Sequence, residues 1–281
     1  MTYPGYQKIE LRQLQMLQLR VMKLIHAICV EKGVNYYLIA GSLLGAVRHK
    51  GFIPWDDDID IAMMRDDFEK FKKEFSKSFP QDKYFLQTFS TDPNFDVPLA
   101  RLCVKNTIQD IPSDRFLKSF KGTYIDIFPL DNVPNSNKLR LKQEKQISKI
   151  RLLFRLKLYR VYESNSVFSV IAKKTISALL TVIPLAYLQK KYNEVLLKYD
   201  GIKSSDVCSM ASKYNYCKQA MPKSIYGTPT LIRFEDTEFF GPEYPIAYLK
   251  KLYGENYMQL PPMEKREIPH DVYVKEGYEF D

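Results

Sequence analysis

The sequence predicts a mixed α/β fold, an α+β core into which a helical segment is inserted. Apolar residues recur at helical spacing over residues 9–32 and Gly33 follows them, which predicts an amphipathic helix that ends at this glycine. Short runs of strand-forming residues then alternate with further helical patterns as far as Pro129. From residue 138 to 200 the pattern is helical alone, and this change marks the inserted segment.

Each element of the core follows from its own periodicity. A short helix is expected over residues 43–49, directly after a Gly41-Ser42 turn. A charged amphipathic helix is expected over 65–79, with Phe68, Phe71 and Phe75 on one face. Strands are expected over residues 34–40, 59–63, 84–86, 97–108 and 124–128, the last ending at Pro129.

The 281 residues divide into three parts. Residues 1–137 form the predicted core, and the turn-rich stretch 132–137 leads out of it. Residues 138–205 form a basic and apolar helical segment, and 206–281 are expected to pack back on the core.

The positive charge is local. Between Lys138 and Arg160 there are nine Lys or Arg and one acid, Glu144, which accounts for +8 of the chain's +9. This basicity predicts an anionic partner, either a membrane surface or a polyanionic glycan; the alternative is an ordinary solvated helix face. A nucleic acid is not expected, because no nucleic-acid-binding motif is present. Residues 175–189 are uncharged but shorter than the ~20 residues of a membrane span, and Pro184 interrupts them.

Cysteine usage and the N-terminus predict a cytoplasmic protein. The four cysteines form no Cys-x-x-Cys pair and are interpreted as reduced, mostly buried thiols. No charged start followed by an apolar run is visible at the N-terminus, so no signal peptide is expected. If the basic helices rest on a membrane, the protein lies at its inner face.

The stretch from Gly41 to Asp60 carries the strongest functional signal. It places four carboxylates in five positions, at 56, 57, 58 and 60, soon after a Gly-Ser turn. Crowded carboxylates repel one another unless a cation lies among them, and their oxygens suit Mg²⁺ or Mn²⁺. Asp58 and Asp60 are expected on one face of a strand.

Asp126, between Ile125 and Ile127, completes a predicted three-carboxylate metal site. Alternatively, Asp56, Asp57 and Asp58 form a solvated acidic turn and backbone N–H groups cap Asp126. Arg101 interrupts an apolar run, and it either pairs with a site carboxylate or emerges at a sheet edge.

These motifs resemble those of the polymerase-beta-like nucleotidyltransferase superfamily. More narrowly, residues 41–49 and 54–60 resemble the LicD family, bacterial phosphorylcholine transferases related to the fukutin-related proteins that transfer ribitol phosphate. The resemblance continues through 124–131 and returns at 252–257 and 260–262. The C-terminal stretch 265–271, in which basic residues are followed by His270, is also similar.

The resemblance implies a polymerase-beta-like core and a CDP-linked alcohol phosphate as donor, CDP-choline in the best-known cases. A hydroxyl of a cell-surface glycan (teichoic acid, lipopolysaccharide or capsule, either free or as a lipid-linked precursor) would be the acceptor, and CMP would be released. Asp58, Asp60 and Asp126 would act in catalysis and hold Mg²⁺. Gly41, Ser42, Arg48 and Arg101 would lie at the donor phosphates. Trp55 either stacks on the donor or anchors the acidic loop.

Two other interpretations remain open. The protein could be a nucleotidyltransferase that uses a nucleoside triphosphate and releases pyrophosphate. It could also be a non-catalytic glycan- or membrane-binding protein, against which the complete set of motif residues argues.

Overall fold

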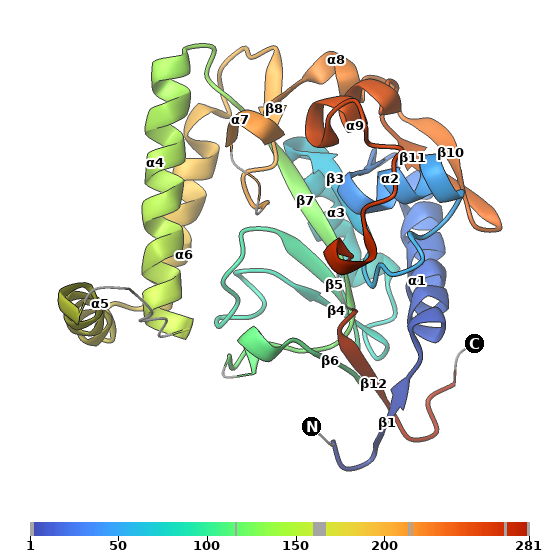
Figure 1. Cartoon of the computed structure of the whole chain (residues 1–281), viewed down its shortest axis with the longest axis horizontal. Coiled ribbons are helices and arrows are strands. Elements are labelled where there is room, and N and C mark those ends of the chain that lie inside the picture. Colours follow the sequence, from blue (N-terminus) through green and yellow to red (C-terminus); the bar gives the residue numbers. More distant parts are fainter. Residues whose placement is uncertain are drawn as a thin grey trace.

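This computed structural model describes residues 3–115, 117–159, 167–212, 214, 216–266 and 269–279. Figure 1 shows a central sheet with α1 on one side and the helices of the inserted segment on the other. The predicted mixed α/β class is therefore confirmed.

The first half of the chain supplies most of the strands. Its elements, in order, are β1 (Tyr6–Ile9), α1 (Leu11–Lys32), β2 (Tyr37–Leu38), α2 (Ala40–His49), β3 (Asp60–Met64), α3 (Arg65–Ser78), β4 (Tyr84–Gln87), β5 (Ala100–Val104), β6 (Thr107–Asp110), η1 (Pro112–Asp114) and β7 (Tyr124–Asn132).

The second half begins with the inserted helices and then returns to the sheets. Its elements are α4 (Asn137–Phe154), the π-helix η2 (Arg155–Tyr159), α5 (Val167–Leu180), α6 (Leu185–Leu196), η3 (Leu197–Tyr199), β8 (Asp206–Cys208), α7 (Tyr216–Gln219), β9 (Met221–Pro222), α8 (Lys223–Tyr226), β10 (Thr230–Phe234), β11 (Thr237–Gly241), α9 (Pro245–Tyr253), η4 (Met263–Lys265) and β12 (Asp271–Lys275).

The main sheet is mixed. Its central order is β2-β3-β7-β5-β4, and β8 and β9 extend it beside β7. The pair β3–β7 is parallel and the other pairs are antiparallel. β12 forms a separate antiparallel sheet between β1 and β6, and β10 and β11 form a hairpin. The two ends of the chain therefore meet in one small sheet.

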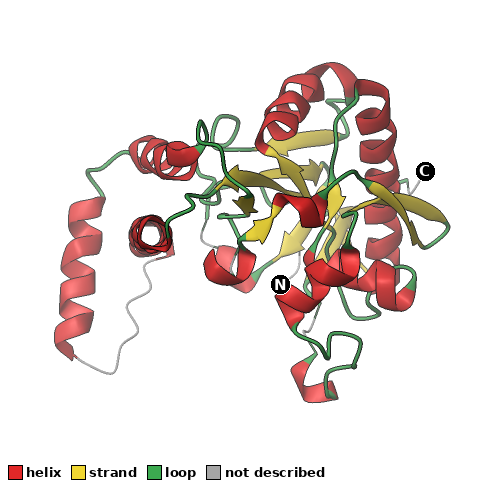
Figure 2. Ribbon diagram, turned by 90° about the horizontal axis from the view of Figure 1, so that it is seen from above, coloured by secondary structure: helices red, strands yellow, loops and turns green. Residues whose placement is uncertain are grey.

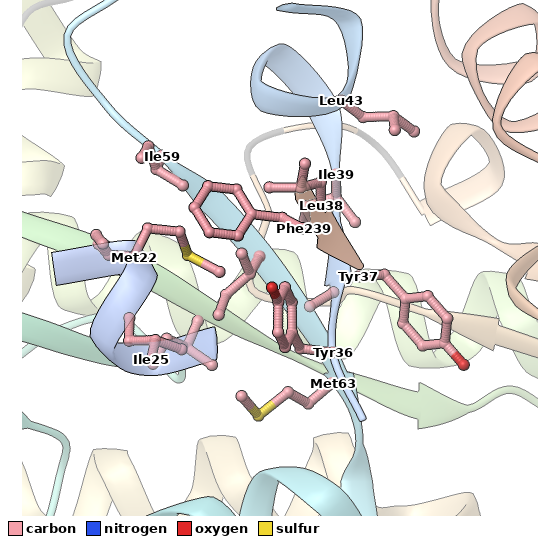
Figure 3. Close-up of a cluster of buried hydrophobic side chains, with 14 of the residues drawn as sticks. Met22, Ile25, Tyr36, Tyr37, Leu38, Ile39, Leu43, Ile59, Met63 and Phe239 are labelled. Atoms are coloured by element: carbon pink, nitrogen blue, oxygen red, sulfur yellow. The ribbon is translucent and has the colours of Figure 1, made fainter. Parts of the chain in front are cut away.

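The main hydrophobic core lies between the sheet, α1, α2 and the hairpin. Met22 and Ile25 of α1 pack there against three residues: Tyr36, which precedes β2, Leu38 of β2 and Phe239 of β11 (Figure 3). Gly33 takes the left-handed conformation, with φ at 61°, and ends α1 as predicted. The predicted face of α3 is also confirmed, since Phe68, Phe71 and Phe75 are buried.

The inserted helices have a hydrophobic cluster of their own. Ile147, Ile150 and Phe154 of α4 pack against Leu188 and Tyr192 of α6. The helical character predicted for this segment is confirmed, although Arg160 to Ser166 lie outside the described residues. The division of the chain into three parts stays a prediction.

Three buried cysteines, Cys29, Cys103 and Cys208, are free thiols, as expected for the reduced state. The side chain of Cys217 is not among those described.

The structure corrects four local predictions. Pro129 does not end its strand, because β7 runs on to Asn132 and pairs Pro129 with Met63 of the parallel neighbour. The strand expected over 34–40 is reduced to Tyr37–Leu38. Gly41 and Ser42 do not form a turn before α2 but its first turn. Asp58 precedes β3, so it does not share a strand face with Asp60.

Candidate active site

The strand register brings together three predicted site residues. In the parallel pair β3–β7, Asp60 lies opposite Asp126, and in the antiparallel pair β5–β7, Asp126 lies opposite Arg101. Residues in register across neighbouring strands point to the same face of a sheet. Arg101 Nε donates to Asp126 Oδ1 at 2.8 Å, so the arginine pairs with a site carboxylate.

The Arg101–Asp126 pair is enclosed by aromatic rings. The guanidinium carbon of Arg101 lies 4.0 Å from the centre of the Tyr124 ring and 5.4 Å from that of Phe95. Burial raises the pKa of Asp126 and Arg101 opposes this shift. For Arg101, burial lowers the pKa, but the charge of Asp126, the neighbouring Tyr124 and the hydrogen bond to Asp126 together raise it further, so the arginine stays protonated.

The acidic loop between α2 and β3 forms the second part of the site. Asp56, Asp57 and Asp58 each bring a carboxylate oxygen within 4.8 Å of the other two. From α1, Gln15 donates to the backbone oxygen of Asp56 at 3.0 Å and Gln18 to that of Asp57 at 2.8 Å. These two buried glutamines fix the loop through its backbone and leave its carboxylates to other partners.

His270 holds the loop from its other side. Its backbone N–H and its Nδ1 both contact Asp57 Oδ2, at 2.6 Å and 2.8 Å. The hydrogen bond that the Asp57 carboxylate accepts raises the pKa of the His270 ring. The C-terminal segment therefore reaches the acidic loop. Glu267 and Ile268 of the same predicted motif lie outside the described residues.

The first turn of α2 packs directly on the acids. Ser42 Oγ accepts a hydrogen bond from the backbone N–H of Asp60 at 2.8 Å. A Cβ at Gly41 would lie 2.9 Å from Asp56 Oδ2, so glycine at this position leaves room for the Asp56 carboxylate as it is placed here. Ser42 thus positions the start of β3, a role that differs from the phosphate contact expected of it.

A cavity of about 390 Å³ opens beside these residues. Its lining includes Gly41, Arg48, Asp56, Asp58 and Asp60. Asp126, which is nearly buried, is not part of the lining. The site therefore has a carboxylate wall that faces the cavity and a buried ion pair behind it.

The rest of the cavity lining, called the aromatic wall here, includes aromatic and basic side chains. Arg48 donates to the backbone oxygens of Tyr257 and Gln259, each at 3.2 Å. The guanidinium of Arg266 lies 4.3 Å from the centre of the Trp55 ring. Tyr214, Tyr253 and Lys265 complete this wall. Trp55 packs against the core and lines the cavity at the same time, so both functions predicted for it are structurally compatible.

The chemistry of the acidic wall fits a divalent cation. Carboxylate oxygens are hard donors, and three of them so close together repel unless a cation is shared among them. Within the described part of the chain this close group is Asp56, Asp57 and Asp58, whereas the predicted ligands were Asp58, Asp60 and Asp126. Asp58 belongs to both sets.

Sequence reasoning missed Gln15, Gln18 and the position of the aromatic wall. A signal for Gln18 was present, because it comes four residues after Leu14 and three before Val21 and thus lies on the apolar face of α1. A polar side chain on a buried helix face needs a partner, and here the partner is the acidic loop.

Comparison with known proteins gives consistent relatives. Residues 33–146 match the family described as LicD/FKTN/FKRP, nucleotidyltransferase domain. The chain is 31% identical to the lipopolysaccharide cholinephosphotransferase LicD of Haemophilus influenzae over 276 aligned residues. The alignment covers 96% of this chain and 98% of that protein. It is 54% identical to the human ribitol 5-phosphate transferase FKRP over 35 aligned residues, and this alignment covers 12% of this chain and 7% of that protein. An uncharacterized protein of Rickettsia typhi is 40% identical over 78 residues, 28% of this chain and 23% of that protein.

The fold, the acidic site and these similarities define a homologue of phosphoryl-group transferases. Since the similarity to LicD extends over nearly the whole of both chains, the chain belongs to the LicD family.

Proposed function

We propose that this protein transfers phosphocholine, or a related alcohol phosphate, from a CDP-linked donor to a hydroxyl of a cell-surface glycan. The observation that carries the proposal is the register of β3 and β7, which pairs Asp60 with Asp126 beside a cavity lined by Asp56 and Asp58. The names of the H. influenzae and human relatives support the class of reaction.

In the proposed reaction, the acceptor hydroxyl oxygen forms a bond to the phosphorus that carries the choline or polyol. The bond from that phosphorus to the oxygen bridging to CMP breaks, and CMP leaves with this oxygen. The hydroxyl proton passes to a carboxylate of the site, for which Asp126 is our candidate. The products are CMP and a phosphodiester.

Asp58, Asp60 and Asp126 are the proposed ligands of Mg²⁺ or Mn²⁺, with Asp56 and Asp57 beside them. When bound, the cation would neutralise charge on the donor diphosphate. Arg101 opposes the rise that burial imposes on the pKa of Asp126 and orients its carboxylate through the Nε contact. Ser42 fixes the backbone of Asp60, and Gln15 and Gln18 fix the acidic loop. These contacts preorganise the carboxylates.

The other wall of the cavity would receive the donor. Arg48 and Lys265 line the cavity and would supply positive charge to the phosphates of the donor. Tyr214, Tyr253, Tyr257 and Trp55 add aromatic side chains to the lining, which would suit a cationic choline or a base. We further propose that the core is of the polymerase-beta type, which the description of the matched family supports.

The test is a panel of CDP-alcohols, including CDP-choline and CDP-ribitol, incubated with the protein and Mg²⁺ while CMP is measured. We expect CMP release from one of them, loss of release with EDTA, and recovery with Mg²⁺ or Mn²⁺. The family description also names nucleotidyl transfer, so nucleoside triphosphates are tested in parallel. Pyrophosphate release from these without CMP release from any CDP-alcohol would overturn the proposal.

A further inference from the structure

Helix α5 is attached to the protein along one edge only. Figures 1 and 2 show it on the outer side of the inserted helices, away from the sheet. Its contacts are with η2: Ser177 Oγ donates to the backbone oxygen of Leu156 at 2.9 Å, and Lys157 Nζ donates to that of Leu180 at 2.7 Å. Ser177 and Leu180 are its buried side chains among those described.

The opposite face of α5 is apolar and exposed. Phe168 is 87% exposed and Val182, in the turn after the helix, is 81% exposed. Ile171, Ile176 and Leu179 are exposed on the same face, since they follow Phe168 by three, eight and eleven residues. The hydroxyl of Thr175, which also lies on this face, donates to the backbone oxygen of Ile171 and is thus satisfied within the helix.

The length of these helices favours contact with a membrane surface over a crossing. Within the described residues, no single helix is long and apolar enough to span a bilayer. The pair Phe168–Leu180 and Leu185–Tyr199 reaches the necessary length together but is bent by 103°. The second member is also committed to the protein, because Leu188, Tyr192 and Leu196 of α6 are buried in the helical cluster.

The neighbouring helix α4 carries a basic face. Lys138, Lys142, Lys145 and Lys149 recur at helical spacing, and all four are exposed. Within the described part of the chain, none of them takes part in an ion pair. The nearby acid Glu144 is directed elsewhere and accepts a hydrogen bond from the backbone N–H of Tyr216. An exposed apolar helix therefore lies beside uncompensated positive charge.

We propose that α5 and the turn after it insert into the interface of an anionic lipid bilayer, with the lysine face of α4 above the lipid headgroups. Exposed apolar side chains and nearby lysines are the two features that interfacial binding combines. A second copy of the chain fits this surface less well, because the lysine faces of the two copies would repel each other. The proposal does not depend on the donor or on catalysis, since it concerns a surface remote from the acidic site.

The test is co-sedimentation of the full chain with vesicles of phosphatidylcholine alone and of phosphatidylcholine with phosphatidylglycerol. We expect binding to the anionic vesicles, little binding to the neutral ones, and weaker binding at higher salt. Phe168→Ser combined with Leu179→Ser should lower the partition coefficient of the protein onto anionic vesicles by about tenfold or more. Lys142→Glu combined with Lys149→Glu should abolish the preference for anionic vesicles.

Leu231→Ser is the matched control, because Leu231 is 55% exposed and belongs to β10, a strand on the other side of the molecule from α5 (Figure 1). It should bind vesicles as the original protein does, and thermal unfolding should show that every variant is folded. Failure of the original protein to bind anionic vesicles, or full binding by the α5 variant, would overturn the proposal. So would self-association, measured by light scattering, that the α5 substitutions abolish without any vesicle binding. CMP release from a CDP-alcohol, measured separately in solution, tests the transfer activity independently of these outcomes.

Discussion

Asp60 and Asp126 lie opposite each other in the parallel pair β3–β7, and Arg101 holds Asp126 from the next strand. The two carboxylates therefore differ in their surroundings. Asp60 lies at the cavity and Asp126 lies behind it in a buried ion pair. This difference separates the expected effects of substituting them.

Asp60→Ala should abolish transfer and leave the fold intact. Removal of one acid from a crowded group relieves repulsion, so the free energy of unfolding should change by less than about 1 kcal/mol or increase. CMP release should fall more than about a hundredfold, because even residues that only support metal ligands contribute ten- to a hundredfold. Asp66→Asn, at an exposed acid in α3, is the control and should keep full activity. An unfolded Asp60→Ala protein would contradict the assignment.

Arg101→Met should be strongly destabilising. It leaves the carboxylate of Asp126 buried without its cation, which costs about 3–5 kcal/mol in comparable sites. Urea denaturation measures this loss, and Arg101→Met combined with Asp126→Leu should recover much of it because no buried charge remains. Lys23→Met, which breaks the exposed pair with Asp236, should leave the unfolding midpoint nearly unchanged. Equal stability of Arg101→Met and the original protein would show that the pair is not buried in solution.

Sequence patterns predicted the elements in which apolar residues recur at a regular spacing, and they missed features that depend on tertiary contacts. The face of α3 was predictable because Phe68, Phe71 and Phe75 repeat at helical spacing. The sequence predicts a strand end at Pro129, yet β7 continues through this residue, which has no N–H to donate. On the side away from β3, β5 pairs with residues 124–127 and β8 with residues 131–132, so Pro129 lies between the two partners. No local sequence pattern reports this arrangement of neighbouring strands.

The site was predictable to a similar extent. An acid between two isoleucines predicted that Asp126 is buried and partnered, and the in-register Arg101 is that partner. The contact between Gly41 and Asp56 and the contact between His270 and Asp57 join residues far apart in the chain. They depend on how α2 and the C-terminal segment pack, which periodicity does not determine.

Gln18→Met should impair activity through the loop that Gln18 holds. The substitution keeps the side-chain volume but removes the hydrogen bond to the backbone oxygen of Asp57. A lost buried hydrogen bond costs about 1–3 kcal/mol, and the freed loop should lower kcat by about tenfold with a smaller change in KM. Gln143→Met in α4 removes the hydrogen bond to the backbone oxygen of Val195 and also the one that Gln143 accepts from the Tyr216 hydroxyl. It should lose at least as much stability as Gln18→Met but keep kcat, and an equal loss of kcat in both variants would argue against a positioning role for Gln18.

Two glycines of α2 should respond differently to a methyl group. In Gly41→Ala the new Cβ meets the carboxylate of Asp56 at 2.9 Å, and a side chain can move away. Stability should therefore change little, while displacement of Asp56 should lower activity by about tenfold.

In Gly45→Ala the new Cβ lies 2.5 Å from the backbone oxygen of Gly51 and 3.2 Å from the backbone nitrogen of Ile53. These backbone atoms can move only if the whole loop after α2 moves, so the free energy of unfolding should fall by about 1–3 kcal/mol. Thermal unfolding and CMP assays of both variants separate the two effects. The reverse order of stability would contradict these contacts.

Stability should depend on pH through Glu235, which joins the β10–β11 hairpin to α1 and to the loop after α2. Its carboxylate accepts hydrogen bonds from Arg12 at 2.7 Å and from the backbone N–H of Phe52 at 3.2 Å. The hydrogen bond from Arg12 is the main cause that lowers the pKa of Glu235 below its ordinary 4.5. A lowered pKa in the folded state stabilises the protein above the unfolded-state value, and this contribution is lost as pH falls through the folded-state value.

Glu235→Gln should therefore be less stable than the original protein above the ordinary glutamate pKa of 4.5, and the difference should disappear as pH falls through the lowered folded-state pKa. Urea denaturation at several pH values measures it. Glu238→Gln, at an exposed position of the same hairpin, serves as the control and should show no such pH-dependent difference. A constant difference between Glu235→Gln and the original protein at every pH would mean that the carboxylate acts through shape alone, because a charge-dependent contact must weaken once the carboxylate is protonated.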